Sequence, residues 1–110
     1  MPTSQAFKAD FFRALAHPIR VRLLETLGFG EDTVHQLRQQ LALEQPVVSQ
    51  QLAVLRAKNI GCARKRGTTV TCALSDPLIA TLLSVAREIL DNHLVDTQSM
   101  LKELRREGPR

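Results

Sequence analysis

The sequence has no apolar run long enough to cross a membrane and no secretory signal. No stretch reaches the roughly 18 consecutive apolar residues that a membrane-spanning helix needs. The N-terminal segment MPTSQAFKADFF has no basic region followed by an apolar core. Low-complexity tracts and internal repeats are also absent. We therefore expect a cytoplasmic protein without a membrane partner, folded as one domain that spans residues 1–110.

Patterns typical of enzymes are equally scarce. The sequence contains no glycine-rich phosphate loop, no Ser–His or Cys–His pair in a recognisable setting, and no carboxylate pair expected to share a cleft. The three histidines, His17, His35 and His93, fall on different predicted elements. We therefore do not expect an enzyme, and we predict no cofactor.

The charge balance is basic, with 15 lysines and arginines against 11 acidic residues and a formal net charge of +4. Such a balance favours polyanionic partners, with double-stranded DNA first and an acidic membrane surface second. The hydrophobic content of 44% is sufficient for a folded core.

The centre of the chain, at about residues 33–58, is predicted to form two short helices joined by a tight turn. Val34, Leu37 and Leu41 recur at spacings of three and four and give the first helix its buried face. The second helix begins near Gln45, and its exposed N-terminal face is short, uncharged and rich in amide and hydroxyl groups. Such a face can read base edges in a major groove, although a solvated glutamine-rich surface is the alternative. The candidate DNA-reading residues are Gln45, Pro46, Val47, Ser49 and Gln50.

After Lys58 the hydrophobic period changes from 3.6 to 2, which predicts a hairpin wing at about residues 60–74. Its two strands are joined across Gly67. Five cations and no acid occur between positions 56 and 66, and such cations neutralise DNA phosphates without reading sequence. The predicted phosphate contacts are Arg56, Arg64, Lys65 and Arg66.

The two cysteines, Cys62 and Cys72, lie on opposite strands of this hairpin. A three-residue loop centred on Gly67 would pair them, whereas a two-residue loop would not. The cations at positions 64–66 could lower a thiol pKa and favour oxidation. Both residues are therefore either small packing side chains or a redox pair.

The two terminal helices carry more apolar surface than a domain of this size can cover. The first, at about residues 4–15, holds three of the four phenylalanines. The last, at about residues 77–106, would be some 40 Å long at a rise of 1.5 Å per residue. We therefore predict that these helices form a homodimer interface. Its candidate residues are Phe7, Phe11, Leu82, Leu83, Ala86, Ile89 and Leu90.

The order of these elements resembles a winged helix-turn-helix domain of the ArsR/SmtB type. The segment FFRALAHPIRVRLLETL resembles the second-helix signature of that family, VVSQQLAVLR its recognition helix, and KRGTTV its wing. The resemblance covers about residues 7–92 and implies a mainly α fold with a small β-hairpin. It also implies a homodimeric repressor that binds an inverted-repeat operator and is released by an inducer, with its recognition helices about 34 Å apart.

The sequence departs from the metal-sensing members of that family. Residues 31–35, EDTVH, contain no cysteine where those members have a Cys-containing motif, and a second metal site is reduced to Asp76. The remaining positions of that site hold Leu78, Ile89 and Asn92. Because zinc-like sites need three or four N or S ligands, we predict no metal, and the inducer is unassigned. The alternatives are a redox-responsive regulator, a nonspecific DNA binder and a protein-interaction module.

Overall fold

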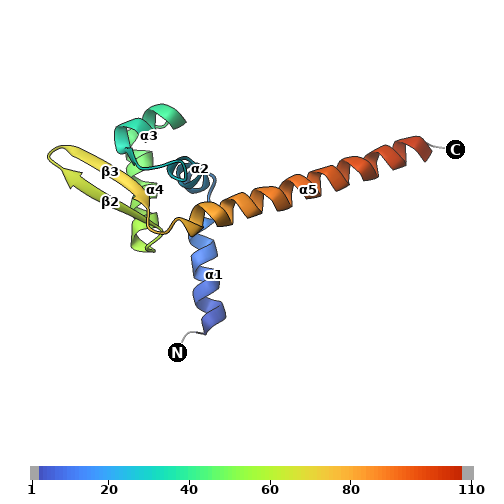
Figure 1. Cartoon of the computed structure of the whole chain (residues 1–110), viewed down its shortest axis with the longest axis horizontal. Helices are drawn as coiled ribbons and strands as arrows, with labels where there is room; N and C mark the ends of the chain where they lie inside the picture. Colours follow the sequence, from blue (N-terminus) through green and yellow to red (C-terminus); the bar gives the residue numbers. More distant parts are fainter. Residues whose placement is uncertain (1–2, 108–110) are drawn as a thin grey trace. The chain divides into compact units, whose positions relative to one another are not determined.

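The structure is a computed structural model in which residues 3–107 are described. It is mainly helical with a small antiparallel sheet, as the sequence predicted (Figure 1). The elements are α1 (Ser4–Leu15), α2 (Pro18–Leu27), β1 (Asp32–Thr33), α3 (Val34–Leu41), α4 (Gln45–Ala57), β2 (Gly61–Arg66), β3 (Thr69–Leu74) and α5 (Leu78–Glu107). The chain divides into two compact units, Met1–Ala80 and Thr81–Arg110, which are described separately.

Local side-chain bonds determine where α2 and α3 begin. The His17 Nδ1 atom accepts a hydrogen bond of 3.1 Å from the Ile19 N–H, and Pro18 occupies the first helical position. At the start of α3, the Thr33 hydroxyl accepts from the Gln36 N–H while the Gln36 side chain accepts from the Thr33 N–H. This reciprocal pair is a capping box, which satisfies two backbone donors that the helix itself leaves unpaired.

The turn between α3 and α4 is three residues long and sets the angle between the two helices. Ala42 ends α3 with a φ of 53°, in the left-handed region that usually favours glycine. The Leu43 N–H then donates to the Arg38 carbonyl oxygen at 3.1 Å, which closes the end of α3. Pro46 lies in the first turn of α4, where a missing N–H has no helical partner to lose.

A hydrophobic core joins these helices to the sheet. Its buried members come from α2, α3, α4 and β3, and several of them have no exposed surface. They are Leu23, Leu27, Leu37, Leu41, Val48 and Cys72. Because Val48 anchors one side of α4 in this core, the opposite side of that helix faces outward.

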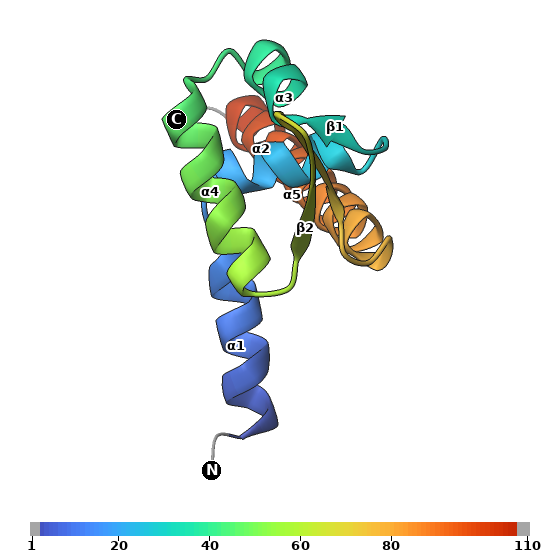
Figure 2. The ribbon, with the colours of Figure 1, turned by 90° about the vertical axis from the view of Figure 1, so that its left-hand side faces the viewer.

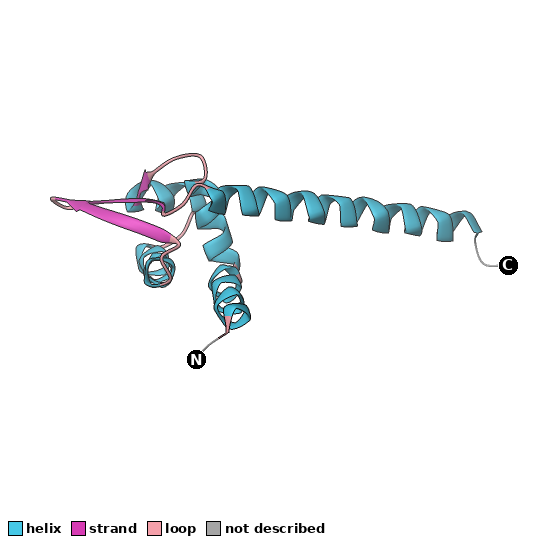
Figure 3. Ribbon diagram, turned by 60° about the horizontal axis from the view of Figure 1, so that its bottom comes forward, coloured by secondary structure: helices cyan, strands magenta, loops and turns pink. Residues whose placement is uncertain are grey.

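The sheet contains one short strand that the sequence did not predict. Its strand order is β1-β3-β2, and all neighbours are antiparallel (Figures 2 and 3). Asp32 of β1 pairs with Cys72 of β3, and Thr33 pairs with Thr71. Two residues are too few to show a period of 2, so β1 has no detectable sequence signal.

Helix α5 is a single continuous helix of 30 residues (Figure 3). Before its first residue, the Asp76 Oδ1 atom accepts a hydrogen bond of 2.9 Å from the Leu78 N–H. Within residues 3–107, no helix combines the length and the apolar character needed to span a membrane.

Candidate nucleic-acid interface

The N-terminal half of α4 presents an exposed polar face. Gln45, Pro46, Ser49 and Gln50 are exposed and Val47 is half-buried, whereas Val48 and Leu55 on the other side are fully buried. This face carries no charged side chain, so its amide and hydroxyl groups are free to bond other molecules. The side chains predicted to read DNA therefore lie together on one accessible surface.

Gln51, the third glutamine of this helix region, has a different environment. It is half-buried, and its Oε1 atom accepts a hydrogen bond of 3.0 Å from Arg20 Nη1. The same guanidinium donates from Nε to the Ala14 carbonyl oxygen at 2.6 Å and from Nη2 to the Arg13 carbonyl oxygen at 3.3 Å. Arg20 thus fastens α4 to the corner between α1 and α2. No local pattern in the sequence predicts this role, because the partners of Arg20 lie on α1 and α4.

The wing cations are divided between the two faces of the hairpin. Lys65 pairs with Val70, and this pair lies on the same face as the half-buried Ala63 and the buried Cys72. Arg64 and Arg66 alternate to the other face. Arg64 forms a salt bridge of 3.1 Å with Glu31. Arg64, Lys65 and Arg66 of the wing therefore do not form a single cluster. Arg56, the fourth cation predicted to contact phosphates, is exposed in the last turn of α4.

The strand register shows that the two cysteines do not pair with each other. The hairpin loop contains two residues, and Cys62 is opposite Ala73 while Cys72 is opposite Ala63. Consequently the two side chains lie on opposite faces of the hairpin. Both cysteines are free, with Cys62 exposed and Cys72 buried.

The expectation that nearby cations lower a thiol pKa is wrong for Cys72. Burial raises the pKa of the Cys72 thiol, and the neighbouring Cys62 raises it further. Arg56 acts in the opposite direction but is outweighed by the loss of water. The buried thiol is therefore protonated at neutral pH and is a poor nucleophile.

An open groove is lined by residues of α3, α4 and the hairpin. In Figure 2, α3 and the hairpin both lie to the right of α4. The volume of the groove is about 580 Å³. Gln45, Ser49 and Arg56 of α4 form one wall, and Arg38 lies on the α3 side. Three of the predicted DNA-binding residues thus line the edge of a concave surface.

The residues that match the family's metal positions do not fit a metal. The Thr33 hydroxyl caps α3 and the Asp76 carboxylate bonds the Leu78 N–H. Leu78 and Ile89 offer no ligand atom in their side chains. Across residues 3–107, no three histidine, cysteine, aspartate or glutamate side chains are grouped so that they could hold a metal ion.

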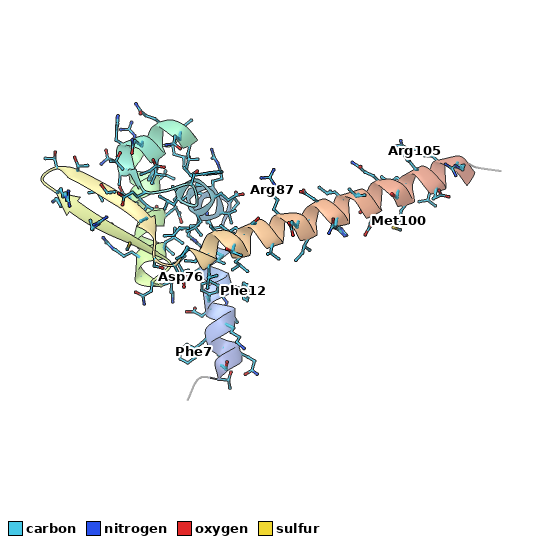
Figure 4. All side chains as sticks on the ribbon, in the orientation of Figure 1. Phe7, Phe12, Asp76, Arg87, Met100 and Arg105 are labelled. Atoms are coloured by element: carbon cyan, nitrogen blue, oxygen red, sulfur yellow. The ribbon has the colours of Figure 1, made fainter. Side chains whose placement is uncertain are left out.

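The apolar side chains predicted to form a dimer interface are mostly exposed. Phe7 and Phe12 both project from α1 (Figure 4). Phe7 is 65% exposed, and Phe12, which is not among the predicted interface residues, is 55% exposed. Phe11 is half-buried, and its ring meets that of Phe12 edge-on at 5.6 Å between centroids. On α5, two of the predicted residues are half-buried and three are exposed. The half-buried residues are Leu82 and Leu83, and the exposed ones are Ala86, Ile89 and Leu90.

Comparisons with known proteins place the chain among bacterial regulators. Residues 17–60 match the family model described as "Bacterial regulatory protein, arsR family". The chain is 41% identical over 102 residues to the uncharacterized HTH-type transcriptional regulator Rv0081 of Mycobacterium tuberculosis, covering 92% of this chain and 90% of that protein. It is 37% identical over 76 residues to the biofilm growth-associated repressor of Xylella fastidiosa, covering 69% of this chain and 67% of the repressor.

Solved structures agree with these matches. The crystal structure of Rv0081 has a TM-score of 0.79 and 39% identity, and the match covers 88% of this chain and 98% of that one. The solution structure of a homodimeric winged helix-turn-helix DNA-binding domain, Mb0332 from Mycobacterium bovis, has a TM-score of 0.72 and 25% identity. The match covers 80% of this chain and 82% of that one. This chain therefore belongs to the ArsR family of helix-turn-helix transcriptional regulators.

Proposed function

We propose that this chain is a transcriptional repressor that binds an inverted-repeat DNA operator as a homodimer and is released by a signal. The observation that carries the proposal is the exposed, uncharged face of α4, whose opposite side is held in the core by Val48 and Leu55. A rigid helix with free polar side chains at its N-terminal end suits insertion into a major groove. The role requires binding only, without a catalysed reaction, in the cytoplasm where a bacterial chromosome lies.

The proposed division of labour on DNA follows from side-chain chemistry. Gln45 and Gln50 carry amides that can bond adenine through two hydrogen bonds, and the Ser49 hydroxyl can bond any base edge. Arg56 and the wing cations Lys65 and Arg66 would bond phosphates and supply affinity without sequence preference. Arg64 would join them when it exchanges Glu31 for a phosphate oxygen.

The proposed dimer is supported by apolar surface on both terminal helices. A single helix is marginal in water unless another element covers its apolar face, yet Ile89 is 64% and Leu90 60% exposed on α5. A second copy of the chain would bring the same apolar residues to meet them, as a two-fold interface requires. Mb0332, one of the similar structures, is a homodimer.

The dimer can be tested with one interface variant and one control on the same helix. Ile89→Glu places a charge in the proposed apolar contact, so we expect sedimentation equilibrium to give the monomer mass. Arg87→Glu, at an exposed position two residues away (Figure 4), should leave the dimer mass unchanged. An Ile89→Glu protein that still sediments as a dimer would argue against this interface.

The proposed operator can be identified by selecting DNA fragments that bind the protein from its source genome. We expect the selected fragments to share an inverted repeat whose half-sites are centred about 10 base pairs apart or a multiple of that distance. The complex should contain two chains per site. Fragments without a common sequence would instead indicate a nonspecific DNA binder.

A further inference from the structure

The groove between α3, α4 and the hairpin has features of a small-molecule site as well as of a DNA surface. It has a volume of about 580 Å³ and lies wholly within the Met1–Ala80 unit. Part of its lining is apolar and continuous with the core, and this part includes Leu27, Val34, Leu52 and Val70. Such a mixed lining, with a few polar groups on an apolar wall, is typical of ligand pockets.

Arg38 lines the groove and carries an unsatisfied donor. Its Nε–H is shielded from solvent and has no hydrogen-bond acceptor within residues 3–107. A buried donor without a partner is costly, and the cost is larger when the group is charged. An acceptor in the groove would relieve this cost once a turn of the Arg38 side chain brought the Nε–H within its reach.

The charge of the groove is also unbalanced. Arg38 and Arg56 both line it, and none of its described lining residues is an aspartate or glutamate. Two guanidinium groups in a lining without a carboxylate favour an anionic occupant, and a guanidinium binds a carboxylate through two parallel hydrogen bonds. The apolar part of the lining favours a hydrophobic body attached to that anion.

We infer that this groove binds a small amphipathic carboxylate, with the carboxylate group accepting hydrogen bonds from Arg38 and an apolar or aromatic body lying against Val34, Leu52 and Val70. The binding site itself requires no DNA and no second copy of the chain, because all of its residues belong to one unit.

A consequence for regulation rests on the proposed function. Gln45, Ser49 and Arg56 line the groove and also belong to the proposed DNA-binding surface. A ligand that occupies these side chains would prevent them from bonding DNA, so carboxylate and operator would compete directly. Release would then need no long-range conformational change.

The binding site can be tested by calorimetric titration of the full-length protein with 1-naphthoate in the absence of DNA. We expect saturable binding, and at least about tenfold weaker binding of the neutral 1-naphthamide, because hydrogen bonds to a charged acceptor are roughly twice as strong as those to a neutral one. Arg38→Gln should weaken naphthoate binding by a similar factor. The control Lys8→Gln removes one positive charge from exposed α1, outside the groove, and should bind as the unchanged protein does.

A second measurement covers the case in which Arg38→Gln does not fold. In heteronuclear NMR of the unchanged protein, naphthoate should shift the Arg38 Nε–H signal and the amide signals of Ala63 and Val70. Failure of naphthoate to bind, equal binding of naphthoate and naphthamide, or shifts confined to residues outside the groove would each overturn the proposed site. If Arg38→Gln binds naphthoate normally but loses affinity for DNA, the missing acceptor is a DNA phosphate and the inference is wrong.

The competition can then be measured separately with a selected operator fragment. We expect the apparent Kd for the operator to rise in proportion to the naphthoate concentration once this exceeds the naphthoate Kd, and the Arg38→Gln protein should lose this effect. An operator Kd that does not change at saturating naphthoate would overturn the competitive mechanism. A protein that binds naphthoate but no DNA fragment would instead contradict the proposed function and support the ligand site.

Discussion

The Arg64 guanidinium lies 3.1 Å from the Glu31 carboxylate, which joins the wing to the turn before β1. Both side chains are largely exposed, so the salt bridge contributes little to stability. If Arg64 contacts DNA as proposed, Glu31 would compete with phosphate oxygens for this wing cation and would add a negative charge beside the backbone.

Replacing Glu31 with glutamine should therefore tighten binding to all DNA sequences by a few-fold. The plot of log K against log salt concentration should also become steeper by about one unit, since one more cation would neutralise a phosphate. Glu25→Gln is the matched control, because it removes the same charge from an exposed position of α2 without affecting Arg64. Equal effects of the two substitutions would show that net charge alone, and not the release of Arg64, is responsible.

Replacing Lys65 with alanine should weaken binding to specific and unrelated DNA alike. This lysine has no acidic partner within residues 3–107, so its loss should make the salt dependence shallower by about one unit of slope. Fluorescence anisotropy with operator and scrambled duplexes at several salt concentrations would measure both effects. A change in base preference alone would contradict the assignment of the wing to phosphates.

Gln50 and Gln51 are neighbours in sequence, yet their substitution should have different consequences. Gln51→Ala removes the acceptor of the Arg20 Nη1 hydrogen bond and should lower the free energy of unfolding by about 1 kcal/mol. Gln50→Ala changes an exposed side chain and should alter stability by less than about 0.5 kcal/mol. Thermal unfolding followed by circular dichroism would test this, and equal stabilities would indicate that the Arg20 contact is not formed in solution.

The two cysteines should differ in reactivity and in their effect on stability at high pH. Cys62 is exposed and should react rapidly with a thiol reagent, whereas the buried Cys72 should react only when the protein opens. Because the folded state raises the pKa of Cys72, the unfolded chain loses its proton first as the pH increases. The contribution of this thiol is present below its unfolded pKa of about 8.5 and is lost as the pH rises through the higher folded value.

That pH dependence can be isolated by comparing variants. Cys72→Ala should remove this part of the stability decline in alkaline solution. Cys62→Ala should retain most of it, because burial is the main cause of the raised pKa. If both thiols react at the same rate in the folded protein, the buried position of Cys72 is incorrect.

The sequence predicted the helices and the exposed face of α4 well because periodic apolar residues determine which side of a helix is buried. Val34, Leu37 and Leu41 show this pattern on α3. Long-range relationships were not predictable in the same way. The pairing of β1 with β3, the Arg20–Gln51 bond and the Arg64–Glu31 bridge each join segments that are distant in sequence. A hydrogen bond or salt bridge between two segments that are distant in sequence produces no periodic pattern from which it could be predicted.

The cysteine pair illustrates how one local detail determines a site. The sequence left two loop lengths open, and they predict opposite relationships between Cys62 and Cys72. The structure has the two-residue loop, so the side chains lie on opposite faces of the hairpin. The groove was also unpredictable, because it is lined by residues from α3, α4 and both long strands of the sheet.

The central claim is that the exposed face of α4 reads DNA sequence, and its most direct test is the ratio of affinities for a selected operator and an unrelated duplex of equal length. For the unchanged protein we expect a ratio of at least about a thousand at physiological salt. The double substitution Ser49→Ala with Gln50→Ala should reduce that ratio toward one while leaving the affinity for unrelated DNA intact. A ratio that the double substitution does not change would contradict the claim.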